Sequence, residues 1–440
     1  MEEEFHNHMR IPWHDYTKKS IGHPITEASL SEKASIIGRT GIMLLSCGTG
    51  AWRVRSSMNT LARELGITCT ADIGLLSIEY TCIDGGNCYT ESLCLFNTGV
   101  NTSKLYRMEE FVNKFAVNCK KMSGDELHTL LDRIHEIHGF YSPPFLGLAA
   151  AVACCAFTFL LGGGPVEMFC AFLGAGAGNY LRAKMNQHHL TLFLCTAASV
   201  ALACVVYTLA FMALKAGLHI SIHHEAGYIC SMLFIIPGFP FITSGIDLAK
   251  LDMRSGLERL TYAIIIIAVA TLAAWMLALV LHLKPMDFLP LGLSKFQYLI
   301  LRLIASFFGV LGFSVMFNSP LRLAATAGLI GAIANTTRLE LVDLASFPPA
   351  AAAFLGALLA GLLASMIKTS IGYPRISLTV PSIVIMVPGL YLYRAIYNIG
   401  ITSIDTGAYW FTEALLIIMA LPLGLIFARI ITDKTFRRCS

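Results

Sequence analysis

The segment IIPGFPFITSGIDL, residues 235–248, decides the fold class because it places a Pro-Gly pair inside an otherwise apolar stretch. A second segment, MVPGLYLYRAIYNI at residues 386–399, carries the same pair. Proline lacks a backbone N–H and glycine tolerates unusual dihedral angles, so each pair predicts a broken helix. Freed backbone groups are tolerated inside a membrane only where they line a cavity in the protein. We therefore expect Pro237-Gly238 and Pro388-Gly389 to be hinges beside a binding site.

The rest of the chain agrees with a membrane protein. Of its 440 residues, 55% are hydrophobic and only 14% are charged, whereas soluble domains have about 25% charged residues. A transmembrane helix needs about 20 mostly apolar residues. Ten segments meet this need, at about 144–162, 165–182, 190–214, 226–248, 259–283, 297–316, 320–338, 347–368, 379–399 and 408–429. We expect a multi-pass α-helical protein with about ten transmembrane helices.

The first third of the chain is different in composition. Residues 1–143 hold 17 acidic and 14 basic residues, and the apolar remainder holds 11 acidic and 18 basic residues. Helical patterns and a hairpin signal around Asp84-Gly85-Gly86-Asn87 predict a small α+β domain at 1–143. The first 30 residues contain no apolar run typical of a signal peptide, so we expect this domain in the cytosol.

Basic residues predict the orientation of the membrane part. With the N-terminal domain inside, twelve Lys/Arg fall in the inner loops and tail and four in the outer loops. Positive charge accumulates on the cytoplasmic side of membrane proteins. Both termini are therefore expected in the cytoplasm and the chain in the plasma membrane.

The ten spans resemble two copies of five. FLGAGAGNYLR at 172–182 and GLIGAIANTTR at 328–338 match at an offset of 156 residues. Pro165 and Pro320 open these spans, and the two Pro-Gly pairs match at a similar offset. Because five is odd, the second copy must be inverted. We expect five-helix repeats at 144–283 and 284–440, an arrangement typical of secondary transporters.

Polar side chains beyond the two breaks form the candidate substrate site, because such residues are costly in a membrane. They are Thr243, Ser244 and Asp247 after the first break and Tyr391, Arg394 and Asn398 after the second. Asp247 and Arg394 would suit the ammonium and carboxylate of a zwitterionic amino acid. Alternatively, Asp247 is an interfacial charge that ends its span beside Lys250.

Three acidic residues are candidates for a coupling proton: Asp247, Glu167 and Glu413. Burial would raise the proton affinity of any of them. Glu167 follows a Gly-Gly-Gly-Pro run, so an interfacial position is the alternative for that residue.

The N-terminal domain shows no motif of a known catalyst. It has no G-x-S-x-G elbow, Walker loop or H-E-x-x-H motif. His128, Asp132 and His135 share one helical face, which we interpret as a solvated polar face rather than a metal site. We expect no metal, no cofactor and no nucleic-acid partner.

Five motifs in order resemble the threonine/serine exporter family. They are RTGIMLLSCGTGAWRV (39–54), FNTGVNTSKL (96–105), GGGPVEMFCAFLGAGAGNYLR (162–182), IIPGFPFITSGIDLAKLDMRSGLERL (235–260) and VPGLYLYRAIYNIG (387–400). The resemblance implies ten spans, a cytosolic N-terminal domain, and export of threonine and serine driven by the membrane potential or a proton gradient. Related two-chain systems imply dicarboxylate (succinate) export as the alternative.

Together these observations predict an exporter of small hydroxy amino acids, working by alternating access and coupled to proton entry. A dicarboxylate exporter, a membrane-anchored enzyme with a catalytic cytosolic domain, and a passive channel remain as alternatives. The partners expected are the amino acid, protons and the lipid bilayer, and the sequence leaves self-association open.

Overall fold

The computed structural model describes residues 11–18, 22–137, 139–218, 227–283, 288–401, 403–434 and 436–437. The chain forms two compact units. The N-terminal unit comprises Met1–Gly139 together with Asp247–Arg259, and the membrane unit comprises Phe140–Ile246 and Leu260–Ser440. The sequence places the domain boundary near 143, and it does not anticipate the assignment of 247–259 to the N-terminal unit. The predicted boundary between the two repeats, at 284, lies outside the described residues.

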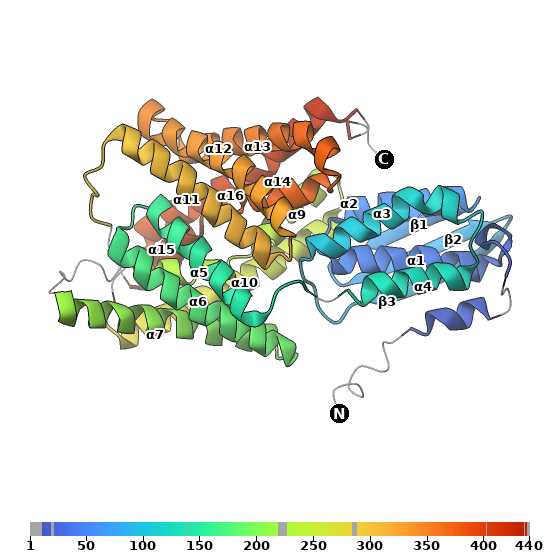
Figure 1. Ribbon diagram of the computed structural model, residues 1–440, viewed down its shortest axis with the longest axis horizontal. Helices are drawn as coiled ribbons and strands as arrows, with labels where there is room; N and C mark the ends of the chain where they lie inside the picture. The colour runs from blue at the N-terminus through green and yellow to red at the C-terminus, as the bar shows by residue number, and fades with distance from the viewer. Residues whose placement is uncertain are drawn as a thin grey trace. The chain divides into compact units, whose positions relative to one another are not determined.

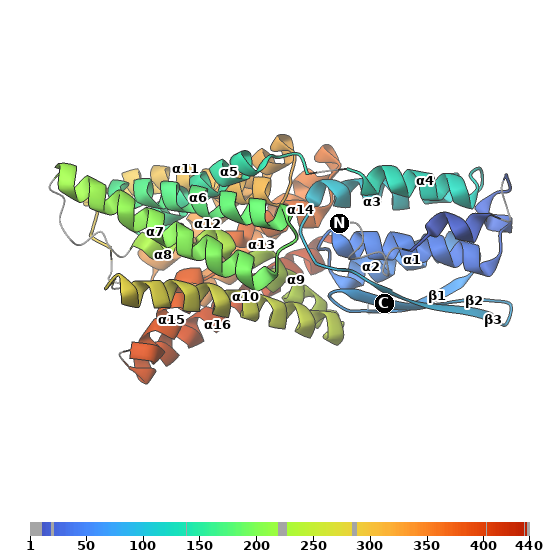
Figure 2. The same ribbon diagram turned by 90° about the horizontal axis from the view of Figure 1, so that it is seen from below.

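The N-terminal unit has three layers, which Figure 2 shows edge-on: a sheet, then α1 and α2, then α3 and α4. The helices are α1 (Leu30–Ser46), α2 (Ala51–Glu64), α3 (Thr102–Asn118) and α4 (Gly124–His135). The strands are β1 (Thr68–Ile73), β2 (Ser77–Asp84) and β3 (Asn87–Cys94), antiparallel in the order β1-β2-β3. Two short 3₁₀ helices precede α1, η2 (Trp13–Thr17) and η3 (Ile25–Glu27).

Local sequence explains these elements. Gly85 and Gly86 both have positive φ, which is why the β2–β3 turn occurs at the predicted hairpin. In β2, Ile78, Tyr80 and Cys82 alternate with more exposed residues and face the helices. Helix α1 is buried almost throughout because it is the middle layer, and this accounts for its apolar sequence.

The membrane unit is all helical (Figure 1). Its first half contains α5 (Pro143–Leu160), α6 (Pro165–Gln187), α7 (Leu192–Leu218), the pair α8 (Tyr228–Ser231) and α9 (Gly238–Ala249), and α10 (Met253–Val280). A 3₁₀ turn, η5 (Leu233–Ile235), separates α8 from α9. Its second half contains α11 (Lys295–Met316), α12 (Leu321–Ala345), α13 (Pro349–Ile371), the pair α14 (Arg375–Val384) and α15 (Gly389–Ile401), and α16 (Ile404–Thr432).

Every predicted span coincides with one helix or one broken pair. Among the described residues, six helices are long and apolar enough to cross a membrane, and eight if each broken pair is one span. Helices α6 and α12 are long enough, but glycine, polar and charged residues lower their hydropathy. The chain is therefore a multi-pass helical membrane protein, and the number ten stays a prediction.

Small residues bring the membrane helices close together. A Cβ at Gly312 of α11 would lie 2.5 Å from the carbonyl oxygen of Ala149 in α5, so these backbones are in contact. Likewise, a Cβ at Gly147 of α5 would lie 2.9 Å from the carbonyl oxygen of Gly176 in α6. Close approach of this kind is how membrane helices gain packing energy without a hydrophobic driving force.

Candidate functional site

The two broken helices meet at their breaks. The first pair bends by 53° around Pro237 and the second by 47° around Pro388. A Cβ at Gly238 would lie 3.2 Å from the side chain of Val384, just before the second break. A Cβ at Gly389 would collide with Ile236, just before the first break. The two broken helices therefore cross so closely that Gly389 leaves no room for a side chain and Gly238 leaves little.

A pair of tyrosines joins the two halves at this crossing. The hydroxyl of Tyr228, at the start of α8, lies 2.5 Å from that of Tyr393 in α15. Both side chains are buried, and their rings meet edge to face. This hydrogen bond links the first broken helix directly to the second.

A cavity of about 700 Å³ opens beside the second break. Residues 385–390 line part of it, so the first turn of α15 begins at the cavity. Its charged lining residues are Lys295, Arg302, Arg338, Glu340, Asp343 and Arg394. Four of these are basic and two acidic, which leaves two positive charges in excess.

Tyr391, Arg394 and Trp410 form one wall of the cavity. The guanidinium of Arg394 lies 4.9 Å from the ring centre of Trp410, and Tyr391 packs edge-on against the same ring at 5.1 Å. Contact with an aromatic face stabilises a guanidinium and fixes its position. Two predicted site residues, Tyr391 and Arg394, are thus brought together.

The other arginines of the cavity are held by polar partners. Arg302 forms an ion pair with Glu340 at 2.8 Å and a second one with Asp343. Both acidic side chains of the lining are therefore paired with Arg302. Arg338 donates from Nε to the amide oxygen of Asn335 at 3.0 Å and, within the described part of the chain, has no carboxylate partner. Its charge therefore stays available to the cavity.

Sequence analysis missed Arg338 and Trp410 as site residues. It counted Arg338 among the loop charges, because the residue ends a predicted span. The spacing Asn335-x-x-Arg338 was the available signal, since a buried asparagine one helical turn away can fix an arginine by hydrogen bonding.

Asp247 is not part of this cavity, and it belongs to the N-terminal unit. Its Oδ2 accepts from the backbone N–H of Ala51 at 3.2 Å and from the Ser255 hydroxyl at 3.0 Å, and it lies 3.3 Å from Nε of Arg259. Arg259 also donates to the carbonyl oxygen of Thr49 at 2.8 Å. The carboxylate thus occupies the positive end of α2, and both charges are fully buried.

The remaining predicted residues make local contacts. The Thr243 hydroxyl donates to the Phe239 carbonyl of its own helix at 3.0 Å, and Ser244 is buried beside it. The Asn398 amide donates to the Arg394 carbonyl at 2.7 Å. Glu167 is buried and accepts from the Gly164 N–H at 3.0 Å, while Glu413 is half-buried on α16. None of these side chains lines the cavity.

Comparison with family models identifies the chain. A model described as "Putative threonine/serine exporter" matches residues 35–282, more than half of the 440 residues. The chain belongs to the threonine/serine exporter family. A second model of the same family, described as "Threonine/Serine exporter, ThrE", matches residues 302–431, so the threonine/serine exporter models together cover most of the chain. The resemblance expected from the five motifs is confirmed.

One curated relative of this exporter is the "Probable succinate transporter subunit YjjP" of Escherichia coli strain K12. It is 25% identical over 245 residues, which cover 53% of this chain and 91% of the relative. No solved structure matches the chain.

Proposed function

We propose that the chain exports small carboxylate-bearing metabolites, threonine and serine first, and binds the substrate in the cavity beside the second break. One observation carries this proposal: Arg394 and Arg338 line a cavity that is also lined by the residues at the break of a transmembrane helix. In transporters, such half-helix ends bind the charged groups of substrates.

Carboxylate recognition follows from the chemistry of the lining. Guanidinium groups match carboxylates in a bidentate manner. The first turn of α15 begins at Gly389 in the cavity, and the N-terminal end of a helix favours an anion. The carboxylate of the substrate would bind between Arg394 and this helix end, with Tyr391 beside it.

Alternating access of two inverted repeats is supported by similar contacts at similar places in the two halves. The amide of Asn179 in α6 donates to the Leu146 carbonyl of α5, and that of Asn335 in α12 donates to Ser306 of α11. A Cβ at Gly174 would meet Ser231 of the first broken helix. Equivalently, a Cβ at Gly331 would meet Ser382 of the second. The two halves would therefore move as similar bodies about the crossed breaks.

Export would be coupled to proton entry across the plasma membrane, with both termini in the cytoplasm as the distribution of basic residues predicts. Glu413 lies three residues from Trp410 on α16 and is the candidate nearest in sequence to the cavity wall. Glu167 and Asp247 are the other candidates, and each is already held by backbone N–H donors.

Dicarboxylate export is the second candidate. The excess of two positive charges in the cavity lining matches the two negative charges of succinate. The name of the YjjP relative also points to succinate. A zwitterion would need an acceptor for its ammonium group. The carbonyl groups of residues 385–387 at the break would serve as this acceptor.

Efflux measurements test the proposal. Cells lacking their own exporters would be loaded with threonine, through a threonine dipeptide, or with succinate. Arg394→Gln should reduce export because losing a charge-assisted hydrogen bond costs about 1.5–3 kcal/mol, or roughly 10- to 150-fold in apparent affinity. The matched control is Arg322→Gln, an exposed arginine of α12 outside the cavity.

The outcomes are distinct. Threonine release lost in Arg394→Gln and kept in Arg322→Gln supports the amino-acid exporter. Succinate release that is lost in Arg394→Gln and kept in Arg322→Gln identifies the substrate as a dicarboxylate. Wild-type rates in Arg394→Gln at equal expression would remove the cavity as the binding site.

A further inference from the structure

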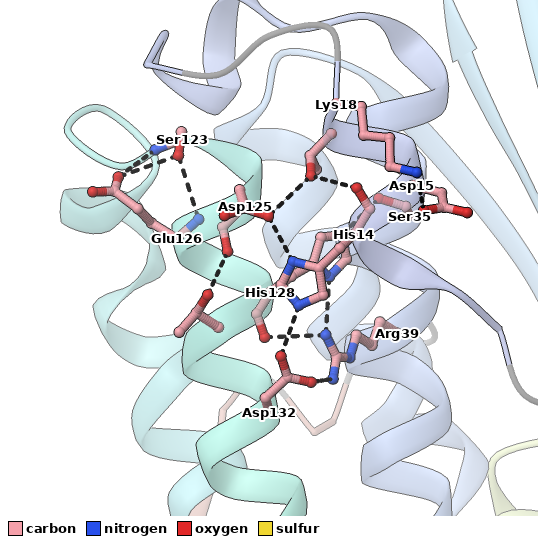
Figure 3. A network of polar contacts seen from close by, with 12 residues as sticks. His14, Asp15, Lys18, Ser35, Arg39, Ser123, Asp125, Glu126, His128 and Asp132 are labelled. Carbon is pink, nitrogen blue, oxygen red and sulfur yellow. Dashed lines mark hydrogen bonds and ion pairs between the residues drawn. The ribbon is translucent and has the colours of Figure 1, made fainter.

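A polar cluster holds η2 (Trp13–Thr17) against α1 and α4 in the N-terminal unit (Figure 3). The ring of His14 lies between two carboxylates of α4. Its Nδ1 is 2.6 Å from Oδ1 of Asp125, and its Nε2 is 2.8 Å from Oδ2 of Asp132. Among the described residues, no group of three such side chains has the geometry of a metal site.

The geometry fixes the protonation state of His14. An ionised carboxylate only accepts hydrogen bonds, so both ring nitrogens must donate and the ring carries a positive charge. The hydrogen bonds to Asp125 and Asp132 accordingly raise the pKa of His14 above 6.5. Reciprocally, the bond from His14 lowers the pKa of Asp125. At Asp132, burial raises the pKa, but the hydrogen bonds from Arg39 and His14 outweigh burial and the pKa is lowered.

His128, the other histidine of the cluster, is neutral. Nη1 of Arg39 lies 3.2 Å from its Nδ1, and a guanidinium can only donate, so Nδ1 carries the lone pair. Its Nε2–H then donates to the Ser35 hydroxyl at 3.0 Å. Burial lowers the pKa of His128 to about 3. The ring of Trp13 stacks on this neutral ring at 6.0 Å. The face of α4 that we expected to be solvated is therefore covered at His128, whereas His135 is exposed.

Other charged and titratable groups surround η2. Asp15 and Lys18 pair with each other at 2.7 Å within the segment. On β3, Glu91 accepts from the Tyr16 hydroxyl at 2.8 Å, and Tyr89 is close by. Burial raises the pKa of Tyr16 and Tyr89. Helix α1 contributes the charged residues Glu32 and Arg39. Glu32 lies next to Gly124, as does Thr17, and Arg39 pairs with Asp132. His14 is therefore the group of this cluster that loses its charge first as the pH rises from neutral.

We propose that His14 is a proton-binding site, where a bound proton closes residues Trp13–Thr17 onto α1 and α4 and loss of that proton to solvent releases them. A neutral ring has one N–H, so one of the two carboxylates would lose its donor and face a lone pair. Neither Asp125 nor Asp132 can supply the missing proton, because both are ionised at neutral pH.

The direction of the pH dependence follows from these shifts. The pKa of His14 is raised in the folded protein. Its contribution to the stability of the closed segment is therefore complete below about pH 6.5 and disappears as the pH rises through the raised pKa. At the acid end, the contribution of Asp125 and Asp132 disappears as the pH falls through their lowered pKa values. Closure is thus restricted to the pH interval between the lowered pKa values of the two aspartates and the raised pKa of His14.

Trp13 provides a direct probe of this site. The full-length protein would be labelled with 5-fluorotryptophan in lipid nanodiscs, and its ¹⁹F spectrum recorded from about pH 6 to about pH 10. Trp13→Phe assigns the signal. We expect a single titration of the Trp13 signal with a midpoint above 6.5 in the wild type.

Three variants decide the outcome. His14→Gln should hold the Trp13 signal at its alkaline position at every pH, and His14→Arg, a permanent cation, should hold it near the acidic position. His23→Gln, an exposed histidine in the same region, should titrate like the wild type. A wild-type signal that does not move, or one that titrates unchanged in His14→Arg, would overturn the proposal.

Discussion

The two broken helices share a backbone design and differ in their side chains. Both break at Pro-Gly, bend by about 50°, and present the glycine to the other break. After the first break, Asp247 is buried against Arg259 and the end of α2. After the second, Arg394 lies in a cavity. The two breaks therefore share a backbone geometry, while the charged side chain that follows the break lines a cavity after the second break and is buried in an ion pair after the first.

The largest effect should come from removing the shared feature. Gly389→Val and Gly238→Val would each place a branched side chain in the close crossing, where overpacking costs about 1–3 kcal/mol and forces the helices apart. We expect export to fall by at least about tenfold in both, since 1.4 kcal/mol corresponds to a factor of ten. The efflux assay measures this.

Gly217→Val is the control, because a Cβ at Gly217 has no neighbour within 4 Å. It should leave export unchanged. If only one of the two break variants lost export at equal expression, the hinges would not be equivalent and the comparison would fail.

The second prediction separates a structural arginine from a binding arginine. Arg259→Gln leaves the buried carboxylate of Asp247 without its charged partner, which should cost about 3–5 kcal/mol of the free energy of unfolding. Asp247→Asn combined with Arg259→Gln should recover much of that loss. Thermal unfolding of the purified full-length protein measures both.

Two other arginines sharpen this contrast. Arg254→Gln, on the same helix α10 but in an exposed cluster of ion pairs, should cost less than about 1 kcal/mol. Arg394→Gln should reduce export with little loss of stability, since that side chain is only half-buried. A stable Arg259→Gln variant with normal unfolding would show that the buried pair is not structural.

The smallest effect concerns the link between the halves. Tyr228→Phe or Tyr393→Phe leaves one buried hydroxyl without its partner and should cost about 1 kcal/mol, whereas the double change should be nearly neutral. Tyr180→Phe, an exposed tyrosine of α6, is the control. A double-mutant cycle on thermal unfolding gives the coupling energy, and strictly additive losses would show that the two hydroxyls do not interact.

Local signals in the sequence predicted most of the fold. Hydropathy located the helices of the membrane unit, and the Pro-Gly pairs located both bends, because these depend on residues adjacent in the chain. Asp84-Gly85-Gly86-Asn87 located the hairpin for the same reason. The capping box of Ser123 and Glu126 at the start of α4 is another feature that depends on residues close in the chain.

The partners of buried charges were not predictable in this way. Asp247 and Ala51 are 196 residues apart, and no periodicity brings them together. The same holds for His14 and Asp132, which are 118 residues apart. For the site, sequence identified Tyr391 and Arg394 from their position after the break, but the cavity that contains them requires α11, α12 and α16 as well. Polar residues in a membrane segment indicate a function, and only the tertiary packing selects which of them face open space.

The crossing of the two breaks also bears on energetic efficiency. An exporter dissipates its driving force whenever both gates open together, because ions then flow without cargo. Here Gly389 contacts Ile236, and Gly238 contacts Val384, so neither helix can straighten without displacing the other. If the two broken helices gate opposite ends of the proposed transport path, hinges that obstruct each other in this way would exclude a conformation with both ends open, and the same few side chains would act as the seal of the membrane.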